Sequence, residues 1–295
     1  MTQAERIAVG TIGIGVTVLG LKLAAWQVTG STALFSDAAE SVVNVVASFV
    51  ALFALRLSAR PADSNHPYGH TKIEFIAAVI EGVLIVVAAV EILRHAWTAF
   101  LHPQPLDAPL LGMALNGVAT LINGAWAGVL FRIGRRLRSP ALVGDGRHLA
   151  SDVVTSLGVL AGVSLVVLTG IHMLDPLLAA ATACYILYAG SRLIFESVGG
   201  LMDIAPPAEE EERMRSIVSR HAAGALEAHD VRMRFAGPAA FVEFHLVVPG
   251  HMTVAEAHAI CDRIEDALKA ERPGLSVTIH VEPEGQAKQV GVLVL

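Results

Sequence analysis

Two pairs of polar residues, each four positions apart, interrupt long apolar stretches of this 295-residue chain. Glu40 and Asn44 lie in "SDAAESVVNVVAS", and His148 and Asp152 lie in "GRHLASDVVTS". Residues four apart lie one turn apart on the same face of a helix. Two such helices packed face to face would offer two carboxylates, one imidazole and one amide oxygen, which suits a divalent metal ion. A bound cation would offset the cost of a carboxylate in hydrocarbon, about 2.5 to 3.5 kcal/mol on insertion scales.

Each of these residues also has a simpler interpretation when it is taken alone. Asn44 could make an interhelical hydrogen bond, and His148 and Asp152 could lie at a hydrated helix end. The two pairs together favour the metal site. Asp37 lies three residues before Glu40 on the same helix face, and we regard it as a candidate proton relay or a further member of the site.

A second group of potential ligands lies in the polar segment "RPADSNHPYGHTKIE". Asp63, His66 and His70 are spaced by three and four positions, and a loop that contains Pro67 and Gly69 can wrap them around an ion. Solvated histidines in a loop are the alternative. The spacing alone therefore predicts a metal site only weakly.

A third group lies in the last 90 residues of the chain. His280 and Glu282 fall on the same face of one predicted strand, and His245 stands in mid-strand between apolar neighbours. Exposed histidines on strands are the alternative. The candidate metal ligands of this region are His229, His245, His258, His280 and Glu282.

Composition identifies a membrane protein. Hydrophobic residues make up 54% of the chain and charged residues 16%, against about a quarter charged in soluble domains. A membrane span needs about 20 apolar residues. Six windows meet that length: Ile7–Val28, Ala33–Leu57, Phe75–Leu101, Leu110–Ile133, Leu149–Thr169 and Pro176–Val198.

The links between these windows differ in charge. Lys and Arg gather in the link from Arg56 to Lys72 and in the link from Arg132 to Arg147, and they are absent from the other three links. By the positive-inside rule the two basic links face the cytoplasm. We therefore expect a multi-pass protein of the cell inner (plasma) membrane with cytoplasmic N- and C-termini.

The chain changes character after "GLMDIAPPAEEEE", where two prolines break the helix and acidic residues begin another. The pattern then predicts helix Glu209–His221, strands Ala228–Phe235 and Ala240–Val248, helix Val254–Ala270 and strand Ser276–Glu282. This order fits a small ferredoxin-like fold. We expect a six-helix transmembrane domain over residues 1–204 and a cytoplasmic α+β, ferredoxin-like domain over residues 205–295.

Several separated motifs in the same order resemble the cation diffusion facilitators, and most of all their zinc- and iron-exporting bacterial branch of metal/proton antiporters. The motifs are "TGSTALFSDAAESVVN", "PADSNHPYGHTKIE", "RHLASDV", "GLMD", "AHDVRMRFAGP", "FVEFHL" and "TIHVEPE". They span nearly the whole chain.

The resemblance implies a role for each domain and each group of residues. Residues 1–204 would form the transport domain, and residues 205–295 would form a metallochaperone-like domain for metal binding and dimerisation. The transport site falls on Glu40, Asn44, His148 and Asp152. The family pattern usually has Asp or His at the first of these positions and Asp at the second, so this chain departs from it at both, and Fe²⁺, Co²⁺ or Mn²⁺ suit the altered set as well as Zn²⁺.

The resemblance also implies sites outside the transport site. The loop site matches Asp63, His66 and His70, and an ion pair of Lys72 with Asp203 would tie the membrane part to the domain that follows. A binuclear cluster in that domain matches His229, His245, His258, His280 and Glu282, the last where the best-studied branch has Asp.

The expected function is the export of a divalent transition metal (Zn²⁺ or Fe²⁺, with Co²⁺, Mn²⁺ or Cd²⁺ as further candidates) in exchange for protons, by alternating access in a homodimer. The expected partners are the lipid bilayer, the metal ion, protons and a second copy, and no nucleic acid. A passive metal channel and a membrane-bound metal-sensing subunit without transport are the alternatives. No HExxH motif is present, and we expect no enzyme activity.

Overall fold

The computed structural model of the chain describes residues 3–137, 140–286, 288 and 293–294. They form two compact units. The first comprises Met1–Arg56 and Ala77–Phe195, and the second comprises Leu57–Ile76 and Glu196–Leu295. The first unit contains most of the length of six long helices, and the second contains a small α+β domain together with the loop between α2 and α3.

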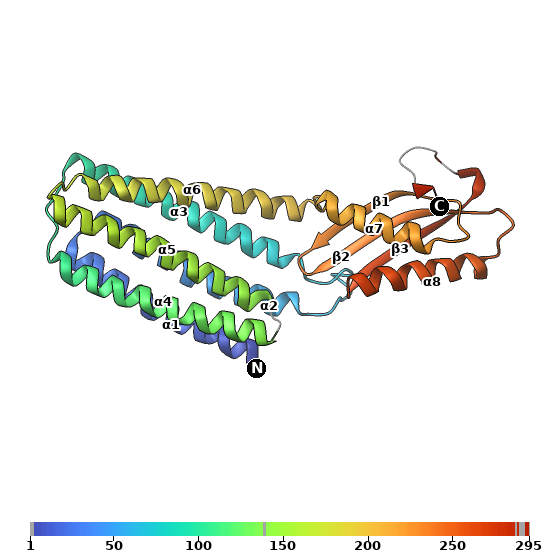
Figure 1. Cartoon of the computed structure of the whole chain (residues 1–295), viewed down its shortest axis with the longest axis horizontal. Coiled ribbons are helices and arrows are strands. Elements are labelled where there is room, and N and C mark those ends of the chain that lie inside the picture. The colour runs from blue at the N-terminus through green and yellow to red at the C-terminus, as the bar shows by residue number, and fades with distance from the viewer. Residues whose placement is uncertain (1–2, 138–139, 287, 289–292, 295) are drawn as a thin grey trace. The chain divides into compact units, whose positions relative to one another are not determined.

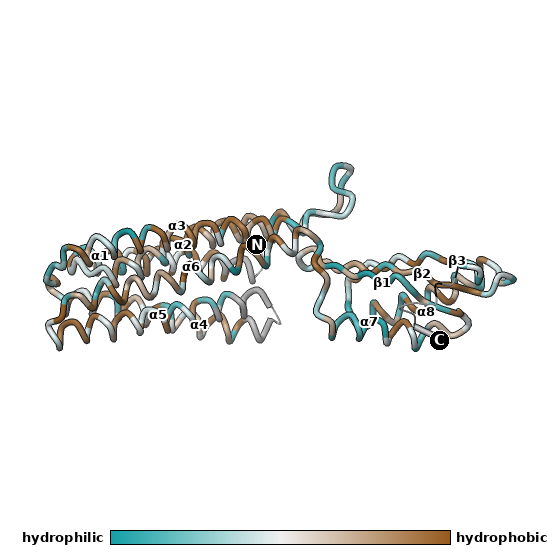
Figure 2. Tube along the Cα trace, turned by 90° about the horizontal axis from the view of Figure 1, so that it is seen from above, coloured by the Kyte–Doolittle hydropathy of each residue, from teal (hydrophilic) through white to brown (hydrophobic). Residues whose placement is uncertain are grey.

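The six long helices confirm the six predicted spans (Figures 1 and 2). Each of them contains a stretch that is long and apolar enough to cross a membrane. Their bounds are α1 Gln3–Thr29, α2 Thr32–Ser58, α3 Ile73–Leu101, α4 Pro109–Leu137, α5 Pro140–Thr169 and α6 Leu174–Leu201.

The link of basic residues between the fourth and fifth spans is largely helical. The apolar stretches end at Ile133 and resume at His148, whereas α4 continues to Leu137 and α5 already begins at Pro140. The arginines of this link therefore lie mostly on helical extensions of the two spans. Arg138 lies outside the described residues.

The start of α2 is held by a carboxylate from another helix. Asp175, near the start of α6, accepts a hydrogen bond from the Ser31 hydroxyl at 2.6 Å and further bonds from the backbone N–H groups of Thr32 and Ala33. A negative charge at a helix N-terminus satisfies free N–H groups and complements the helix dipole. This buried cap fixes where α2 begins, and with it the depth of the polar residues on α2.

Helices α3 and α6 pack closely through small residues. A Cβ on Gly82 would lie 2.6 Å from a side-chain carbon of Ile194, and a Cβ on Gly190 would lie 2.6 Å from Ile85. Glycines at such positions let two helix backbones approach each other in a membrane. The contact fixes the rotation of α3, and Glu81, which is offset by about 100° from Gly82 at 3.6 residues per turn, is turned aside from it.

The C-terminal domain has the predicted α-β-β-α-β order with one short strand added. Its elements are α7 Ala208–His221, β1 Glu227–Ala236, β2 Ala239–Val248, α8 Val254–Glu271, β3 Leu275–Pro283, a 3-10 turn η1 over Glu284–Gln286, and β4 Leu293–Val294. The sheet order is β3-β2-β1-β4. β1 and β2 pair antiparallel, whereas β2 and β3 pair parallel and are joined through α8.

The sheet of this domain buries one face. Both α7 and α8 lie on that face (Figure 2), and α8 begins with a capping box between Thr253 and Glu256. Along β2, Val242, Phe244 and Leu246 enter the core with the two helices. Because side chains alternate along a strand, the intervening residues of β2, including His245, lie on the opposite face.

Candidate metal sites

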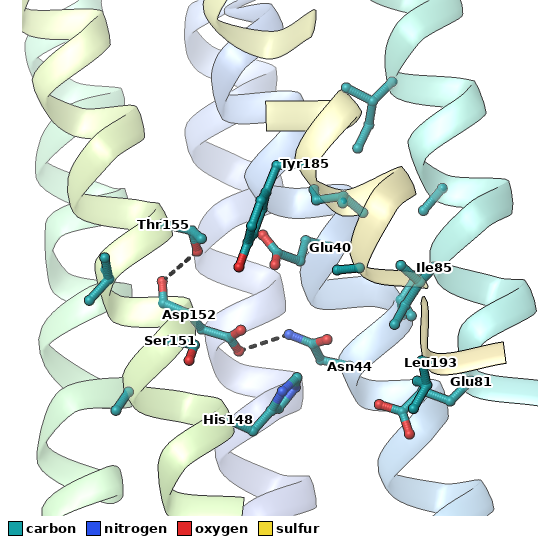
Figure 3. A pocket seen from close by; sticks show the side chains of 17 residues that line it. Glu40, Asn44, Glu81, Ile85, His148, Ser151, Asp152, Thr155, Tyr185 and Leu193 are labelled. Carbon is teal, nitrogen blue, oxygen red and sulfur yellow. Dashed lines mark hydrogen bonds between the residues drawn. The ribbon is translucent and has the colours of Figure 1, made fainter. Parts of the chain in front are cut away.

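The four residues predicted for the transport site line one cavity of about 800 Å³ in the membrane unit (Figure 3). Glu40 and Asn44 come from α2, and His148 and Asp152 come from α5. The predicted i, i+4 pairs therefore face the same space. Tyr185 of α6 and Glu81 of α3 line it as well, so four helices contribute polar groups to what we call the core cavity.

One direct bond joins the two helices inside the core cavity. The Asn44 amide nitrogen donates to Asp152 Oδ2 at 2.8 Å, while Asp152 is 7% exposed. The imidazole of His148 lines the same cavity, one turn before Asp152 on α5 (Figure 3). A carboxylate, an amide oxygen and an imidazole that face one cavity are ligands that a divalent transition metal accepts.

Asp37 belongs to a separate buried network. Its carboxylate accepts hydrogen bonds from Lys22 Nζ at 2.9 Å, from the Ser156 hydroxyl at 2.8 Å and from the Asn116 amide at 2.7 Å. The side chains of Lys22 and Asp37 are 2% and 1% exposed. Because these partners come from α1, α4 and α5, the network joins four helices. It favours a structural role for Asp37, and the relay role stays a prediction.

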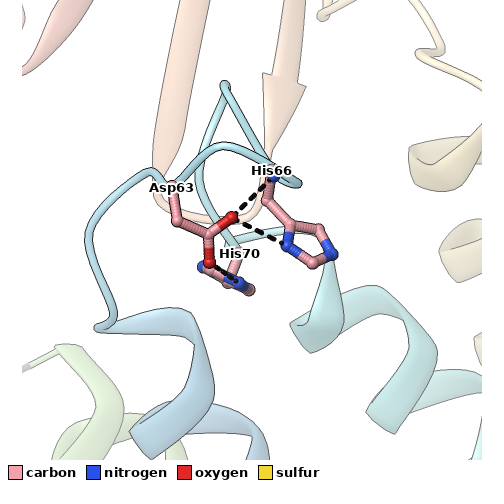
Figure 4. Close-up of side chains that lie close together, drawn as sticks. All are labelled: Asp63, His66 and His70. Carbon is pink, nitrogen blue, oxygen red and sulfur yellow. Dashed lines mark hydrogen bonds and ion pairs between the residues drawn. The ribbon is translucent and has the colours of Figure 1, made fainter.

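The loop residues Asp63, His66 and His70 are brought together in the second unit (Figure 4). Asp63 Oδ1 lies 3.2 Å from His66 Nδ1, and Asp63 Oδ2 lies 3.4 Å from His70 Nε2. The two imidazole rings have centroids 4.3 Å apart. One carboxylate and two imidazoles within this distance form a donor set of the type that binds Zn²⁺.

Backbone N–H groups of this loop hold the Asp63 carboxylate in place. Asp63 Oδ1 accepts the backbone N–H groups of His66 at 2.8 Å and Asn65 at 2.9 Å, and the bond from His66 is the main cause that lowers the pKa of Asp63. Gly69 takes a φ of +84° in the turn between the two histidines, a conformation that glycine adopts without strain.

Three histidines form a row across the C-terminal sheet. His229 of β1 is paired with His245 of β2, which is paired in turn with His280 of β3. Directly paired residues on neighbouring strands project to the same face, and the ring centroids are 5.2 Å apart for the first pair and 4.9 Å for the second. Glu282 lies next to this row, with its Oε1 2.9 Å from His245 Nδ1.

The most buried histidine of this row lacks well-formed side-chain hydrogen bonds within the described part of the chain. His229 is 1% exposed, and its two ring nitrogens lie 3.0 Å from Glu227 Oε1 and 3.4 Å from Glu282 Oε2. Among the described residues neither nitrogen makes a hydrogen bond of good geometry, and neither does Glu282 Oε2. Buried polar atoms without partners are costly. Three imidazoles with carboxylates at these distances fit a zinc-type ion.

His258 stands apart from this row within one chain. It lies on α8, its side chain is 74% exposed, and its carboxylate neighbour is Asp262, one turn further along the same helix at 3.6 Å. Asp230, which the sequence prediction did not include, instead joins His229 and His245 in a group whose ligand atoms lie within 4.8 Å of one another.

The ion pair expected from the resemblance is formed inside the second unit. Lys72 Nζ lies 2.8 Å from Asp203 Oδ1, and the Arg234 guanidinium lies 3.3 Å from the same oxygen. Arg234 also covers the Phe241 ring, at 4.3 Å from its centroid, and Tyr68 contacts Phe241 edge-on. These contacts hold the loop before α3 against the strands β1 and β2.

The pair of Lys72 with Asp203 predicts a pH-dependent loss of local stability. The hydrogen bond from Lys72 lowers the pKa of Asp203 below its ordinary value of 3.8. A carboxylate whose pKa is lowered by folding stabilises the fold at a pH above its pKa in the unfolded chain. This contribution disappears as the pH falls through its pKa in the folded chain. In Lys72→Met we expect faster amide exchange around Asp203 at pH 7, and no difference from the wild type well below pH 3.8. Since both side chains are over a third exposed, the effect is below about 1 kcal/mol.

Hydrogen–deuterium exchange read by mass spectrometry would measure this difference at matched pH. Lys269→Met, which breaks the exposed pair with Glu265 on α8, is the matched control and leaves exchange around Asp203 unchanged. A difference that persists at the acidic end would mean that Lys72 acts through something other than the charge of Asp203.

These features define a multi-pass membrane protein whose helices enclose polar, ligand-bearing residues, joined to a small α+β domain. Residues 9–202 match the family described as the cation efflux transmembrane domain, and residues 206–284 match the cation efflux protein cytoplasmic domain. The chain belongs to this family, the cation diffusion facilitators. Its members are divalent metal efflux transporters and not enzymes.

Relatives in this family align over nearly their whole length. An uncharacterized transporter, sll1263, of Synechocystis sp. is 42% identical over 280 residues, which cover 95% of this chain and 90% of the relative. The cation-efflux pump FieF of Cronobacter sakazakii is 32% identical over 280 residues, which cover 95% and 92%.

Two solved structures align with a smaller part of the chain. The zinc form of CzrB is 52% identical and covers 30% of this chain and 99% of its own, with a TM-score of 0.28. The metal-bound C-terminal domain of CzcD from Thermotoga maritima is 30% identical and covers 27% and 94%, with a TM-score of 0.25.

Several residues of these sites were missed by sequence reasoning. Lys22 and Glu81 are charged residues within apolar windows, and that signal alone was sufficient to mark both as functional candidates. The others carry no such signal, because their roles depend on contacts across helices or strands. The residues missed are Lys22, Glu81, Asn116, Ser156, Asp230 and Arg234.

Proposed function

We propose that this protein exports a divalent transition-metal ion, with Zn²⁺ and Fe²⁺ as the first candidates, from the cytoplasm in exchange for protons. The observation that carries the proposal is the core cavity, in which Glu40 and Asn44 of α2 face His148 and Asp152 of α5. Two carboxylates neutralise a divalent cation inside the membrane. The amide and the imidazole supply the remaining ligands.

Proton exchange follows from the chemistry of these ligands. A carboxylate or an imidazole must be deprotonated to hold a metal, so metal ions and protons compete for the same atoms. His148 stands at the start of its span, and imidazole is the side chain that titrates in the physiological range. Protons that enter as the metal leaves would return the cavity to a state that needs no counterion.

The second unit supports a sensing role. The row of His229, His245 and His280 with Glu282 offers a zinc-type donor set on one face of the sheet, and Asp63 with its two histidines offers another. We propose that the protein acts as a homodimer in the cell inner membrane. Metal bound by these domains would favour the transport-competent arrangement of the dimer, as a shift of populations.

The test is metal flux in proteoliposomes that contain a lumenal pH dye, with Zn²⁺, Fe²⁺, Co²⁺, Mn²⁺ and Cd²⁺ presented in turn. We expect metal-driven proton movement in the wild type and its loss in Glu40→Ala and His148→Ala. Glu91→Ala and His251→Ala change exposed residues of the same types and serve as controls. Asn44→Asp is expected to change the order of preference among the five metals.

The outcomes separate this proposal from its alternatives. Metal flux without a proton signal leaves a passive channel. No flux of any of the five metals, together with Zn²⁺ binding to the protein, leaves a metal-sensing subunit. Flux that survives both Glu40→Ala and His148→Ala would place the route outside the core cavity.

Removing His245 tests the sheet cluster separately from transport. His245 lies at the centre of the row, and its Nδ1 lies 2.9 Å from Glu282 Oε1. Changing a residue that only supports a metal ligand lowers metal affinity roughly 10- to 100-fold. Because His245 would be a ligand itself, His245→Ala is expected to lower the Zn²⁺ affinity of the cluster by at least that factor. Equilibrium dialysis of the full chain in detergent measures it, with the exposed His251→Ala as the control. Unchanged Zn²⁺ binding in His245→Ala would remove the cluster from the proposal.

A further inference from the structure

A carboxylate outside the predicted transport site faces the same cavity. Glu81 of α3 lines the core cavity together with Glu40, Asn44, His148 and Asp152, and in Figure 3 its carboxylate points across the cavity towards His148. The close contact of Gly82 with α6 fixes the rotation of α3 that holds Glu81 in this position.

The polar residues of the core cavity form levels along the helix axes. At 1.5 Å per residue, Glu81 and His148 each lie about 12 Å from the start of their own helices, α3 and α5. Asp152 lies about 18 Å from the start of α5, and Asn44 and Glu40 lie about 21 Å and 27 Å from the end of α2. These ends of α2, α3 and α5 are the ones that adjoin the two basic links. Glu81 and His148 therefore form the level nearest to those links.

The charge at each level explains why a carboxylate is needed at this end. Asp152 and Asn44 form the next level into the cavity. Asn44 is neutral, and its amide nitrogen is already bonded to Asp152, so this level offers one carboxylate. A cation that enters past basic links meets a repulsive field, and an acidic group at the mouth of a cavity raises the local cation concentration. Glu81 is half-buried, and its carboxylate points towards His148 at this end of the cavity.

We propose that Glu81 is a fifth residue of the transport site: with His148 it receives the divalent transition-metal ion at the end of the cavity near the basic links. The ion then passes to Asp152, Asn44 and Glu40. Glu81 thus supplies a carboxylate that Asn44 does not, and it sets the affinity of loading. This assignment rests on the proposed transport function and extends it to α3, a helix that contributes none of the four predicted ligands.

The first test compares Glu81→Gln with the wild type in proteoliposomes over a range of Zn²⁺ concentrations. We expect the half-saturating Zn²⁺ concentration to rise about tenfold, with a smaller change in the rate at saturation, because the deeper ligands are intact. Glu91→Gln makes the same change at an exposed position of the same helix and is expected to match the wild type. Equal half-saturation in Glu81→Gln and the wild type would overturn the assignment.

A rescue experiment separates charge from structure. In the double variant Asn44→Asp with Glu81→Gln, a carboxylate returns to the same cavity, and we expect the half-saturating concentration to recover to within about threefold of the wild type. A merely structural role of Glu81 would leave the double variant no better than Glu81→Gln. That result would overturn the proposal that Glu81 supplies the carboxylate that Asn44 lacks.

Labelling of the wild type tests the contact without any substitution, including the case in which Glu81→Gln does not fold. A carboxyl-directed carbodiimide is applied with and without Zn²⁺, and labelled residues are located by mass spectrometry. Zn²⁺ is expected to protect Glu81 and to leave Glu91 unprotected. Equal labelling of Glu81 in both conditions overturns the proposal. If the wild type moves no metal, the transport proposal fails, and this labelling still decides whether Glu81 binds Zn²⁺.

Discussion

Asp152→Asn is expected to abolish metal transport, with a rate at least about 100-fold below the wild type, which corresponds to about 2.8 kcal/mol at 1.4 kcal/mol per tenfold. Asp152 is the carboxylate that bonds to Asn44 and lines the core cavity together with His148. Because Asn44 is already neutral, Asp152→Asn leaves Glu40 as the one carboxylate among the four predicted ligands. A divalent ion that has passed Glu81 to the deeper ligands would then keep an uncompensated charge in the membrane.

The measurement is initial Zn²⁺ uptake into proteoliposomes at fixed protein content. Asp107→Asn makes the same substitution at an exposed position in the link between α3 and α4 and should transport like the wild type. Asp152→Asn that folds and still transports within about threefold of the wild type would contradict a role for Asp152 as a ligand. His148→Asn is a useful companion, since it changes the neighbouring ligand without altering the number of carboxylates.

The spans and the polar pairs on α2 and α5 could be predicted because they depend on local periodicity. Glu40 and Asn44 share a helix face in any α-helix, and the apolar length of a span is written in the sequence. The partners of Asp37 could not be predicted in this way. Lys22 lies 15 residues away, and Asn116 and Ser156 lie on α4 and α5, so their meeting depends on how the helices pack.

The C-terminal domain shows the same division between local and non-local information. Alternation predicted that His280 and Glu282 share a strand face, but the register that aligns His229, His245 and His280 is set by pairing between strands. His258 was included among the metal ligands because of the family resemblance. Within one chain it lies on α8, away from the row of His229, His245 and His280. β4 is two residues long and pairs with β1, which is too short for a periodic pattern to indicate.

Breaking the pair of Lys22 with Asp37 is expected to destabilise the membrane unit by about 3 to 5 kcal/mol for either Lys22→Met or Asp37→Asn, because each single change leaves an uncompensated charge in a buried site. The double variant is expected to recover most of that loss, since replacing both members of a buried pair is often close to neutral. Asn116 can still donate to an amide oxygen at position 37. The free energy of unfolding would therefore be strongly non-additive across the cycle.

Equilibrium unfolding in mixed micelles with a rising fraction of dodecyl sulfate measures the four proteins of this cycle. Arg94→Met breaks the exposed pair with Glu91 on α3 and should cost no more than about 1 kcal/mol. Additive losses would contradict a direct pair of Lys22 with Asp37. The same double variant also decides the relay question, because it is expected to fold and has no carboxylate at position 37. Proton movement that accompanies Zn²⁺ flux in this variant excludes Asp37 as an obligatory relay. Zn²⁺ flux without proton movement assigns that role to Asp37.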